Sequence, residues 1–165
     1  MQRIIRQFPR IGAAAVLSFA VVATGARADG LSVGPVKDPT VAKECSACHM
    51  LYPAGLLPAR SWSRLMNDLG DHFGDNAELD PETAEQIRAY LTANAADTQR
   101  RGTKLLRNLP SGTVPLRITE LPYIAAKHAK RGRVAPATLK RRGAKSPADC
   151  KACHRGAEQG QFDDD

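Results

Sequence analysis

The sequence predicts a mostly α-helical protein of two small lobes joined by long loops. Apolar side chains recur at i, i+3, i+4 and i+7 within residues 59–70, which is the spacing of one helix face. An N-cap residue followed directly by proline, a typical helix start, occurs at residues 38–39, 80–81 and 146–147. The motif Cys-x-x-Cys-His occurs twice, at 45–49 and 150–154, so each predicted lobe has one copy.

This repeated motif is the signature of covalent c-type haem attachment. Two thiols at this spacing can form thioethers to the two vinyl groups of a porphyrin, and the adjacent histidine can bind the iron as an axial ligand. The residues concerned are Cys45, Cys48, His49, Cys150, Cys153 and His154, which include every cysteine of the chain. A zinc site, two disulfides or a thioredoxin-like redox pair would not need a histidine after the second cysteine in both copies. We therefore expect two covalently bound haem c groups.

The two other histidines, His72 and His128, match the number of axial positions that the motif histidines leave open. Two irons have four axial positions, and the sequence has four histidines. An isolated histidine is more often structural, but this count favours bis-His ligation of both irons. We expect His72 to pair with His49 on haem 1. We expect His128 to pair with His154 on haem 2.

Two alternatives to this ligand set stay open. Crossed pairing, with His128 on haem 1 and His72 on haem 2, would close longer loops, but the difference is less than about 1 kcal/mol per loop. Methionine ligation is the other alternative, and Met66 is the only credible sulfur ligand, for haem 1 alone. Core packing on a helix explains Met66 better.

Residues 1–28 are predicted to be a secretory signal peptide. A basic N-terminal region with three arginines precedes a mostly apolar run over 11–25. Ala26-Arg27-Ala28 is an A-x-A cleavage signal. We expect cleavage after Ala28 and a soluble periplasmic product, since c-type haem is attached outside the bacterial cytoplasm. The apolar run is short for a membrane span, and an uncleaved anchor is the alternative.

The N-terminal haem lobe is expected over residues 29–97. Its helices are predicted over 39–49, which carries the first motif, over 59–70, and from residue 81, with Ala84, Ile87 and Leu91 buried. His72 follows the second of these helices in a turn that can present its side chain to an iron. Only 5% of the residues are aromatic, so a conventional core would be thin. We expect the haems to form much of the core.

Residues 98–117 read as a basic connector that contains proline and glycine. The C-terminal haem lobe is expected over 118–165. Its predicted elements are a short helix with His128 that ends at Gly132, a helical turn over 137–142, and a helix that starts at Pro147 and carries the second motif to Gly156. The tail, 160–165, is expected to fray.

Charge is distributed in blocks along the predicted mature chain. Residues 29–99 carry eleven acids and five bases, residues 100–145 carry thirteen bases and one acid, and residues 146–165 carry five acids and two bases. A basic block often indicates nucleic acid binding, but an exported protein meets little nucleic acid. We instead expect these cations to offset haem propionates, steer an acidic redox partner or contact anionic lipid. A plain solvated surface is the simpler alternative for any one of them.

Four features of the chain carry a family resemblance. They are the early Cys-x-x-Cys-His, the run Asp71-His72-Phe73-Gly74-Asp75-Asn76-Ala77 after a Trp-containing helix, Arg117-Ile118-Thr119 with His128, and Cys150-Lys151-Ala152-Cys153-His154-Arg155-Gly156-Ala157-Glu158. Together they resemble the small dihaem cytochrome c family of proteobacteria, called DHC. The resemblance implies a soluble bis-His dihaem electron carrier of two lobes. It also implies a membrane cytochrome b as donor and a monohaem c-type protein, known as sphaeroides haem protein, as acceptor.

Bis-His ligation by itself favours an electron carrier over an enzyme, because it leaves the iron no vacant position for a substrate. Imidazole ligands also predict lower potentials than His/Met ligation. Two alternatives stay open. One is a peroxidase-like dihaem enzyme with a labile distal ligand. The other is an electron-transfer subunit of a larger periplasmic reductase, although in the dihaem subunit of periplasmic nitrate reductase the motifs lie much closer than the 105 positions between Cys45 and Cys150.

Overall fold

The computed structural model describes residues 30–162 except residue 101. The predicted signal peptide and its cleavage point therefore lie outside the described residues. The α-helices are α1 (Pro39–Cys45), α2 (Ala59–Met66), α3 (Pro81–Ala93), α4 (Pro122–Ala129) and α5 (Pro136–Arg142). Shorter 3-10 helices span Ala54–Leu56, Leu69–Asp71, Gly102–Lys104, Ile118–Glu120, Lys130–Gly132, Cys150–Ala152 and Ala157–Gln159. The prediction of a mostly α-helical fold is confirmed.

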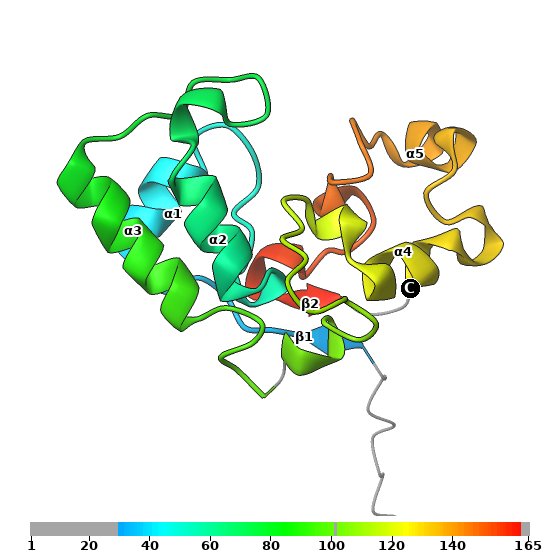
Figure 1. Cartoon of the computed structure of the whole chain (residues 1–165). Helices are drawn as coiled ribbons and strands as arrows, with labels where there is room; N and C mark the ends of the chain where they lie inside the picture. The colour runs from blue at the N-terminus through cyan, green and yellow to red at the C-terminus, as the bar shows by residue number, and fades with distance from the viewer. Residues whose placement is uncertain (1–29, 101, 163–165) are drawn as a thin grey trace, which may run out of the picture.

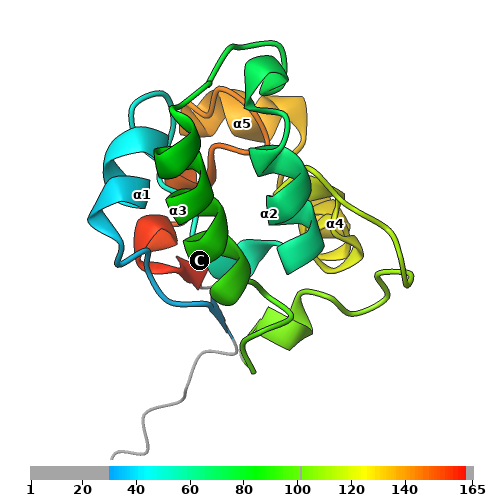
Figure 2. The same cartoon turned by 60° about the vertical axis from the view of Figure 1, so that its left-hand side comes forward.

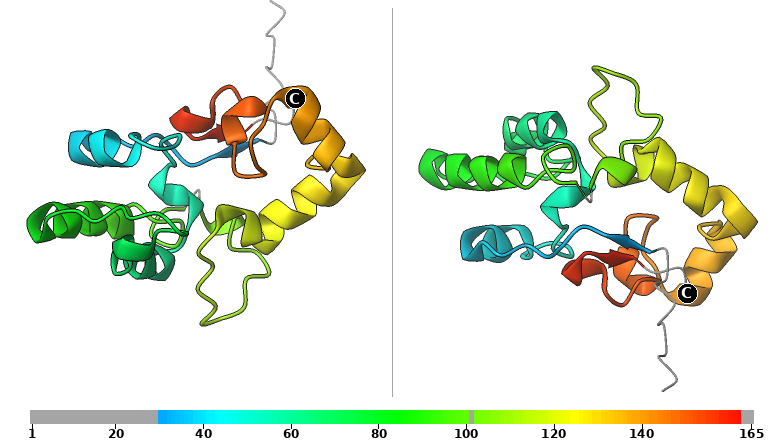
Figure 3. Two further views of the ribbon diagram at one scale, coloured as in Figure 1. Left: turned by 90° about the horizontal axis from the view of Figure 1, so that it is seen from above. Right: turned by 90° about the horizontal axis from the view of Figure 1, so that it is seen from below.

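The helices form two groups with a small sheet between them. In Figure 1, α1, α2 and α3 lie on one side and α4 and α5 on the other, and both views of Figure 3 show the same separation. Helix α3 packs against both α1 and α2 and lies between them in Figure 2. Within the described part of the chain, no helix has the length and apolar character needed to cross a bilayer.

Aspartate caps fix the starts of two helices as predicted. Asp38 Oδ1 accepts hydrogen bonds from the backbone N–H groups of Thr40 and Val41, at 2.9 and 3.0 Å. Asp80 Oδ1 accepts one from Thr83 N at 2.9 Å. In both helices proline follows the cap, where its missing N–H costs no hydrogen bond.

The predicted ends of the first two helices are too late. Helix α1 ends at Cys45, so Cys48 and His49 lie in the turn that follows and not on the helix. Helix α2 ends at Met66 rather than Gly70, and a 3-10 turn continues the chain toward His72. Neither helix has a strong stop signal at its true end.

The predicted helix over the second motif is also wrong, since only the 3-10 turn Cys150–Ala152 forms there. Two polar side chains close local turns in this region. Ser146 Oγ accepts from Ala148 N at 3.1 Å, and Asp149 Oδ2 accepts from Lys145 N at 3.2 Å. Such side-chain bonds to nearby backbone groups compete with a regular helix.

The end of the chain does not fray over its described part. Strand β1 (Leu31–Ser32) pairs antiparallel with β2 (Gln161–Phe162), and Leu31 lies opposite Phe162. Val33 N extends this contact by donating to Gly160 O at 2.9 Å. The two strands lie side by side at the middle of the molecule in Figure 1.

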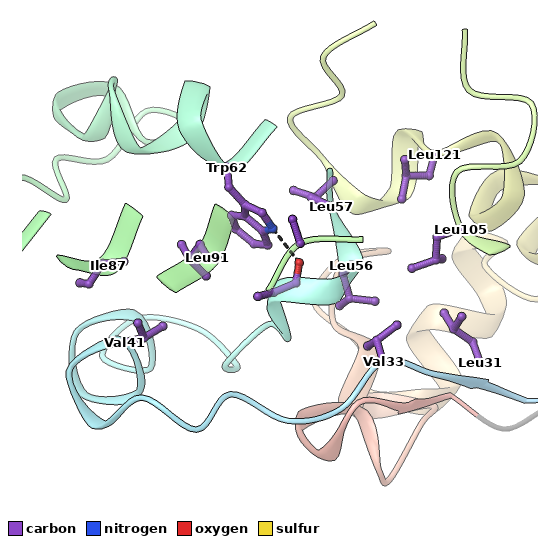
Figure 4. Packing of buried hydrophobic residues seen from close by; sticks show 12 residues of the cluster. Leu31, Val33, Val41, Leu56, Leu57, Trp62, Ile87, Leu91, Leu105 and Leu121 are labelled. Carbon is purple, nitrogen blue, oxygen red and sulfur yellow. Dashed lines mark hydrogen bonds between the residues drawn. The ribbon is translucent and has the colours of Figure 1, made fainter. Parts of the chain in front are cut away.

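One hydrophobic cluster joins the two groups of helices. Its members are Leu31, Val33, Val41, Ala54, Leu56, Leu57, Trp62, Ile87, Leu91, Ala95, Leu105 and Leu121, most of which are labelled in Figure 4. The indole of Trp62 donates to Ala54 O at 2.7 Å, the dashed line in Figure 4. The predicted connector contributes the fully buried Leu105 to this cluster. The connector therefore packs, through Leu105, as part of the core.

The connector approaches the end of the first helical group closely at Gly102. A Cβ atom at this position would lie 2.4 Å from both the Cα and the carbonyl oxygen of Ala96. Only glycine leaves room for this backbone contact.

Candidate functional site

All of the predicted site residues lie around one cavity of about 920 Å³. They are Cys45, Cys48, His49, His72, His128, Cys150, Cys153 and His154. The cavity reaches from the first helical group to the second, because α1, α2, α4 and α5 all contribute lining residues. The apolar stripe of α2, with Trp62, Leu65, Met66 and the following Leu69, forms part of the wall. This agrees with the prediction that the stripe faces a haem, and it leaves Met66 at the cavity.

The first histidine pair consists of His49 and His72. Their ring centroids are 6.2 Å apart and their planes differ by 26°. The Nδ1 atom of His49 lies 2.7 Å from Met50 O and donates to it, because a carbonyl can only accept. This tautomer leaves Nε2 with a free lone pair, as a metal-binding imidazole requires.

His72 is half-buried, and one of its ring nitrogens, the buried Nδ1, has no hydrogen-bond partner among the described residues. Burial, and next the proximity of His49, lower the pKa of His72, while Asp75 acts in the opposite direction. The ring is therefore neutral at physiological pH, which is the form that binds metals.

The second pair, His128 on α4 and His154 at the end of the second motif, repeats this geometry. The ring centroids are 6.4 Å apart and the planes differ by 31°. Burial is the largest cause of the lowered pKa of His128, and the nearby His154 and Arg133 lower it further. The edge of the Phe162 ring packs on His154 at 5.6 Å, so β2 reaches this site.

Both separations suit a metal between two imidazoles. Metal–imidazole bonds are about 2.0 Å long and each ring centre lies about 1.1 Å beyond its nitrogen, so the centres of two rings on opposite sides of one metal would be roughly 6.2 Å apart. The structure brings together the two pairs that are local in sequence. The donors present and their spacing fit two haem groups.

The four cysteines, all within the described residues, form no disulfide. Burial raises the pKa of the Cys150 thiol to about 11 and also raises that of Cys45. Such thiols are poor nucleophiles at neutral pH, which does not suit a thioredoxin-like redox pair. Within residues 30–162, no group of three or more His, Cys, Asp or Glu side chains converges as a zinc site would need.

Comparison with known proteins agrees with this arrangement. A family model of dihaem cytochrome c matches residues 41–162. The chain belongs to the dihaem cytochrome c family. Members carry two covalently bound haem c groups, and this chain has one attachment motif for each.

Three solved structures are similar to this dihaem cytochrome c. A diheme cytochrome c from Rhodobacter sphaeroides is 51% identical, with 78% of this chain and 99% of that chain covered and a TM-score of 0.70. A structure of DHC purified from Rhodobacter sphaeroides is 48% identical, with the same coverage and a TM-score of 0.61. A diheme cytochrome type c from Shewanella baltica is 35% identical, with 76% and 86% covered and a TM-score of 0.58. No curated protein sequence matches the chain at a significant level.

Aromatic neighbours of the histidines are the part of the site that sequence reasoning missed. The ring of Tyr52 lies 4.9 Å from that of His49, and burial raises the pKa of its phenol to about 12, helped by the nearby Cys150 and Asp149. The ring of Phe73 meets His72 edge-on at 4.9 Å. Phe73 is next to His72 in sequence, which is a signal that could have found it, whereas no sequence pattern points to Tyr52.

Backbone geometry holds the turn that presents His72. Its N–H donates to Asp75 O at 2.8 Å, and Asp71 Oδ1 accepts from Gly74 N at 3.0 Å. Phe73 adopts a left-handed backbone conformation, with φ of 61°. A non-glycine residue in this region indicates a turn that its surroundings determine tightly.

Proposed function

We propose that this dihaem cytochrome c is an exported electron carrier in which each iron has two histidine ligands. His49 and His72 would hold haem 1, and His154 and His128 would hold haem 2. The observation that carries the proposal is the distance between ring centroids, 6.2 and 6.4 Å, within the two pairs. Crossed pairing would have to separate rings that already lie at ligand spacing.

The chain's own residues suit electron transfer more than catalysis. Each haem, when bound, supplies an iron that gains or loses one electron. Two imidazoles per iron fill both axial positions, so no substrate position remains and we assign no catalytic residue. The mainly apolar wall of the cavity suits the porphyrin faces, and the preformed histidine pairs need little rearrangement when the charge changes. Imidazole ligation also supports low midpoint potentials.

The basic block offers a surface for a redox partner. Helix α5 carries Lys140, Arg141 and Arg142, all exposed, and Arg142 also lines the cavity. We propose that these cations steer an acidic partner toward haem 2. By resemblance to the family, the donor is a membrane cytochrome b and the acceptor a monohaem c-type protein like sphaeroides haem protein, with no role for nucleic acid.

Location and organisation complete the proposal. A signal peptide over residues 1–28, cleaved after Ala28, would deliver the chain to the periplasm, where c-type haem is attached. The haem lobes would span 29–97 and 118–165, with 98–117 between them.

Low-temperature EPR on the oxidised, signal-cleaved protein tests this function. Two low-spin bis-His signals are expected. A high-spin or His/Met component would overturn the ligand assignment, return attention to Met66 and favour a dihaem enzyme of peroxidase type. Binding of carbon monoxide to the reduced protein would likewise indicate an open or labile iron position and favour the enzyme. Copurification with a large catalytic subunit would instead favour the reductase-subunit alternative.

A further inference from the structure

One side chain connects the two haem sites directly. The ring of Tyr52 lies 4.9 Å from that of His49, the ligand in the first attachment motif. Its hydroxyl donates a hydrogen bond of 2.8 Å to the carbonyl oxygen of Ala148, which is 96 positions away in sequence and two residues before Cys150. Tyr52 and Ala148 both line the shared cavity.

The two ends of Tyr52 therefore contact different sites. Its ring packs beside the first motif, where any tilt of the phenol changes the packing of the His49 imidazole. Its hydroxyl holds the backbone that leads into the second motif, a segment that forms only a 3-10 turn. Because no regular helix stiffens this segment, its position depends on tertiary contacts of this kind.

We propose that Tyr52 is a positioning residue that fixes the second haem attachment segment against the first ligand histidine and so sets the rate of electron exchange between the two sites. The proposal rests on the proposed function, since it takes two haem sites in one carrier as given. In the exchange, one electron leaves the reduced iron and arrives at the oxidised iron. Tyr52 itself gains or loses neither an electron nor a proton.

A second tyrosine of the chain provides a matched control. The hydroxyl of Tyr90 accepts a 2.8 Å hydrogen bond from Lys37 N, 53 positions away, so it also joins distant segments. Tyr90 has no part in the cavity lining. Loss of its hydroxyl tests the effect of removing a long-range hydrogen bond without any contact to a haem site.

The experiment compares the Tyr52→Phe, Tyr52→Leu and Tyr90→Phe variants of the mature holoprotein with the parent. Flash photoreduction of one electron per molecule, followed by optical spectroscopy, reports equilibration between the sites. Proton NMR of the oxidised protein resolves the shifted methyl signals of each haem. We expect Tyr52→Phe to slow equilibration severalfold and to shift signals of haem 2, because only the tie to Ala148 is lost.

Tyr52→Leu, which also removes the ring, should shift the signals of both haems and slow equilibration further. Tyr90→Phe should leave the rate and both sets of signals as in the parent. Equal rates in Tyr52→Phe and the parent would overturn the proposal, as would a change in Tyr90→Phe of the same size. Failure of the proposed function reads out separately, as a high-spin component in the EPR spectrum of the parent itself.

Discussion

The guanidinium of Arg117 lies over the ring of Phe73, 4.1 Å from its centre. The same ring meets His72 edge-on, so a cation from the start of the second helical group supports the distal side of the first site. Phe73 is 44% exposed, and Arg117 covers part of the ring that solvent would otherwise reach. The left-handed backbone of Phe73 thus has a partner that holds its side chain in place.

We predict that Arg117→Ala destabilises the protein by about 0.5–1 kcal/mol, the range for an exposed cation–π contact. It should also broaden the low-spin EPR signal of haem 1 and leave that of haem 2 unchanged. Arg88→Ala is the control, since Arg88 forms a surface ion pair with Glu85 on α3 and does not line the cavity. Equal spectra for the two variants would show that Arg117 does not orient His72.

Removal of one distal histidine at a time should open one iron at a time. In His72→Ala, we expect a high-spin component and carbon monoxide binding at haem 1, with haem 2 still low-spin. His128→Ala should give the reciprocal result at haem 2. If either variant changed both haems equally, local pairing of the ligands would be wrong. Added imidazole should restore the low-spin spectrum by occupying the space of the lost side chain.

Charge reversal on α5 should slow reaction with an acidic partner. The triple variant Lys140→Glu, Arg141→Glu, Arg142→Glu is expected to lower the association rate about tenfold or more at low salt. The difference should shrink as ionic strength rises, because salt screens exposed charges. Lys43→Glu on α1 is the control at an exposed position of the other helical group. Rates that do not depend on ionic strength would remove the steering role from α5.

The N-cap of α3 should give a pH-dependent contribution to stability. Hydrogen bonds from Thr83 lower the pKa of Asp80 below its ordinary value of 3.8. Because the folded pKa is depressed, the carboxylate stabilises the protein fully above the ordinary pKa, and this contribution is lost as the pH falls through the folded pKa. Asp80→Ala should therefore lower Tm at neutral pH, and the difference from the parent should narrow in strong acid.

Asp80→Asn separates the cap from the charge. Asparagine can accept the same hydrogen bond without titrating, so its Tm should stay near that of the parent at neutral pH and show less loss in acid. A constant difference between Asp80→Ala and the parent at every pH would contradict the role of the carboxylate.

Gly102→Ala should destabilise the core where the connector meets Ala96. A Cβ atom at this position would lie 2.4 Å from the Ala96 backbone, so one of the two segments must move. Overpacking of this kind costs about 1–3 kcal/mol, which denaturant titration can measure. Gly70→Ala is the control, because its Cβ would meet only the flexible end of Glu78, at 3.2 Å. Similar losses in both variants would argue against a tight contact at Gly102.

Sequence reasoning succeeded where chemistry or local backbone demands fixed residue types. Haem attachment requires the Cys-x-x-Cys-His spacing, and the family match confirms this interpretation. Asp38 and Asp80 marked true helix starts, because an N-cap acts within the first turn and needs no distant partner. His72 and His128 are the two histidines outside the motifs, and this count was enough to predict them as ligands. The structure places their rings beside those of the motif histidines.

It failed where the outcome depends on contacts between distant segments. Ser146 followed by proline looks like a helix cap, yet its hydroxyl closes a local turn and no α-helix forms. Strands of two residues carry no periodicity, so the pairing of Leu31 with Phe162 left no trace in the pattern. The bond between Tyr52 and Ala148 is invisible for the same reason, since nothing local marks either residue.

The pairing of β1 with β2 brings the two ends of the described chain together, so a short link could join them. A circular permutant that links Phe162 to Leu31 and opens the chain between residues 106 and 113 would keep each histidine pair on one continuous segment. Both attachment motifs would also survive, in reversed order. The order in which the two lobes are synthesised would then depend only on where the chain is opened. The folded structure would not depend on that order.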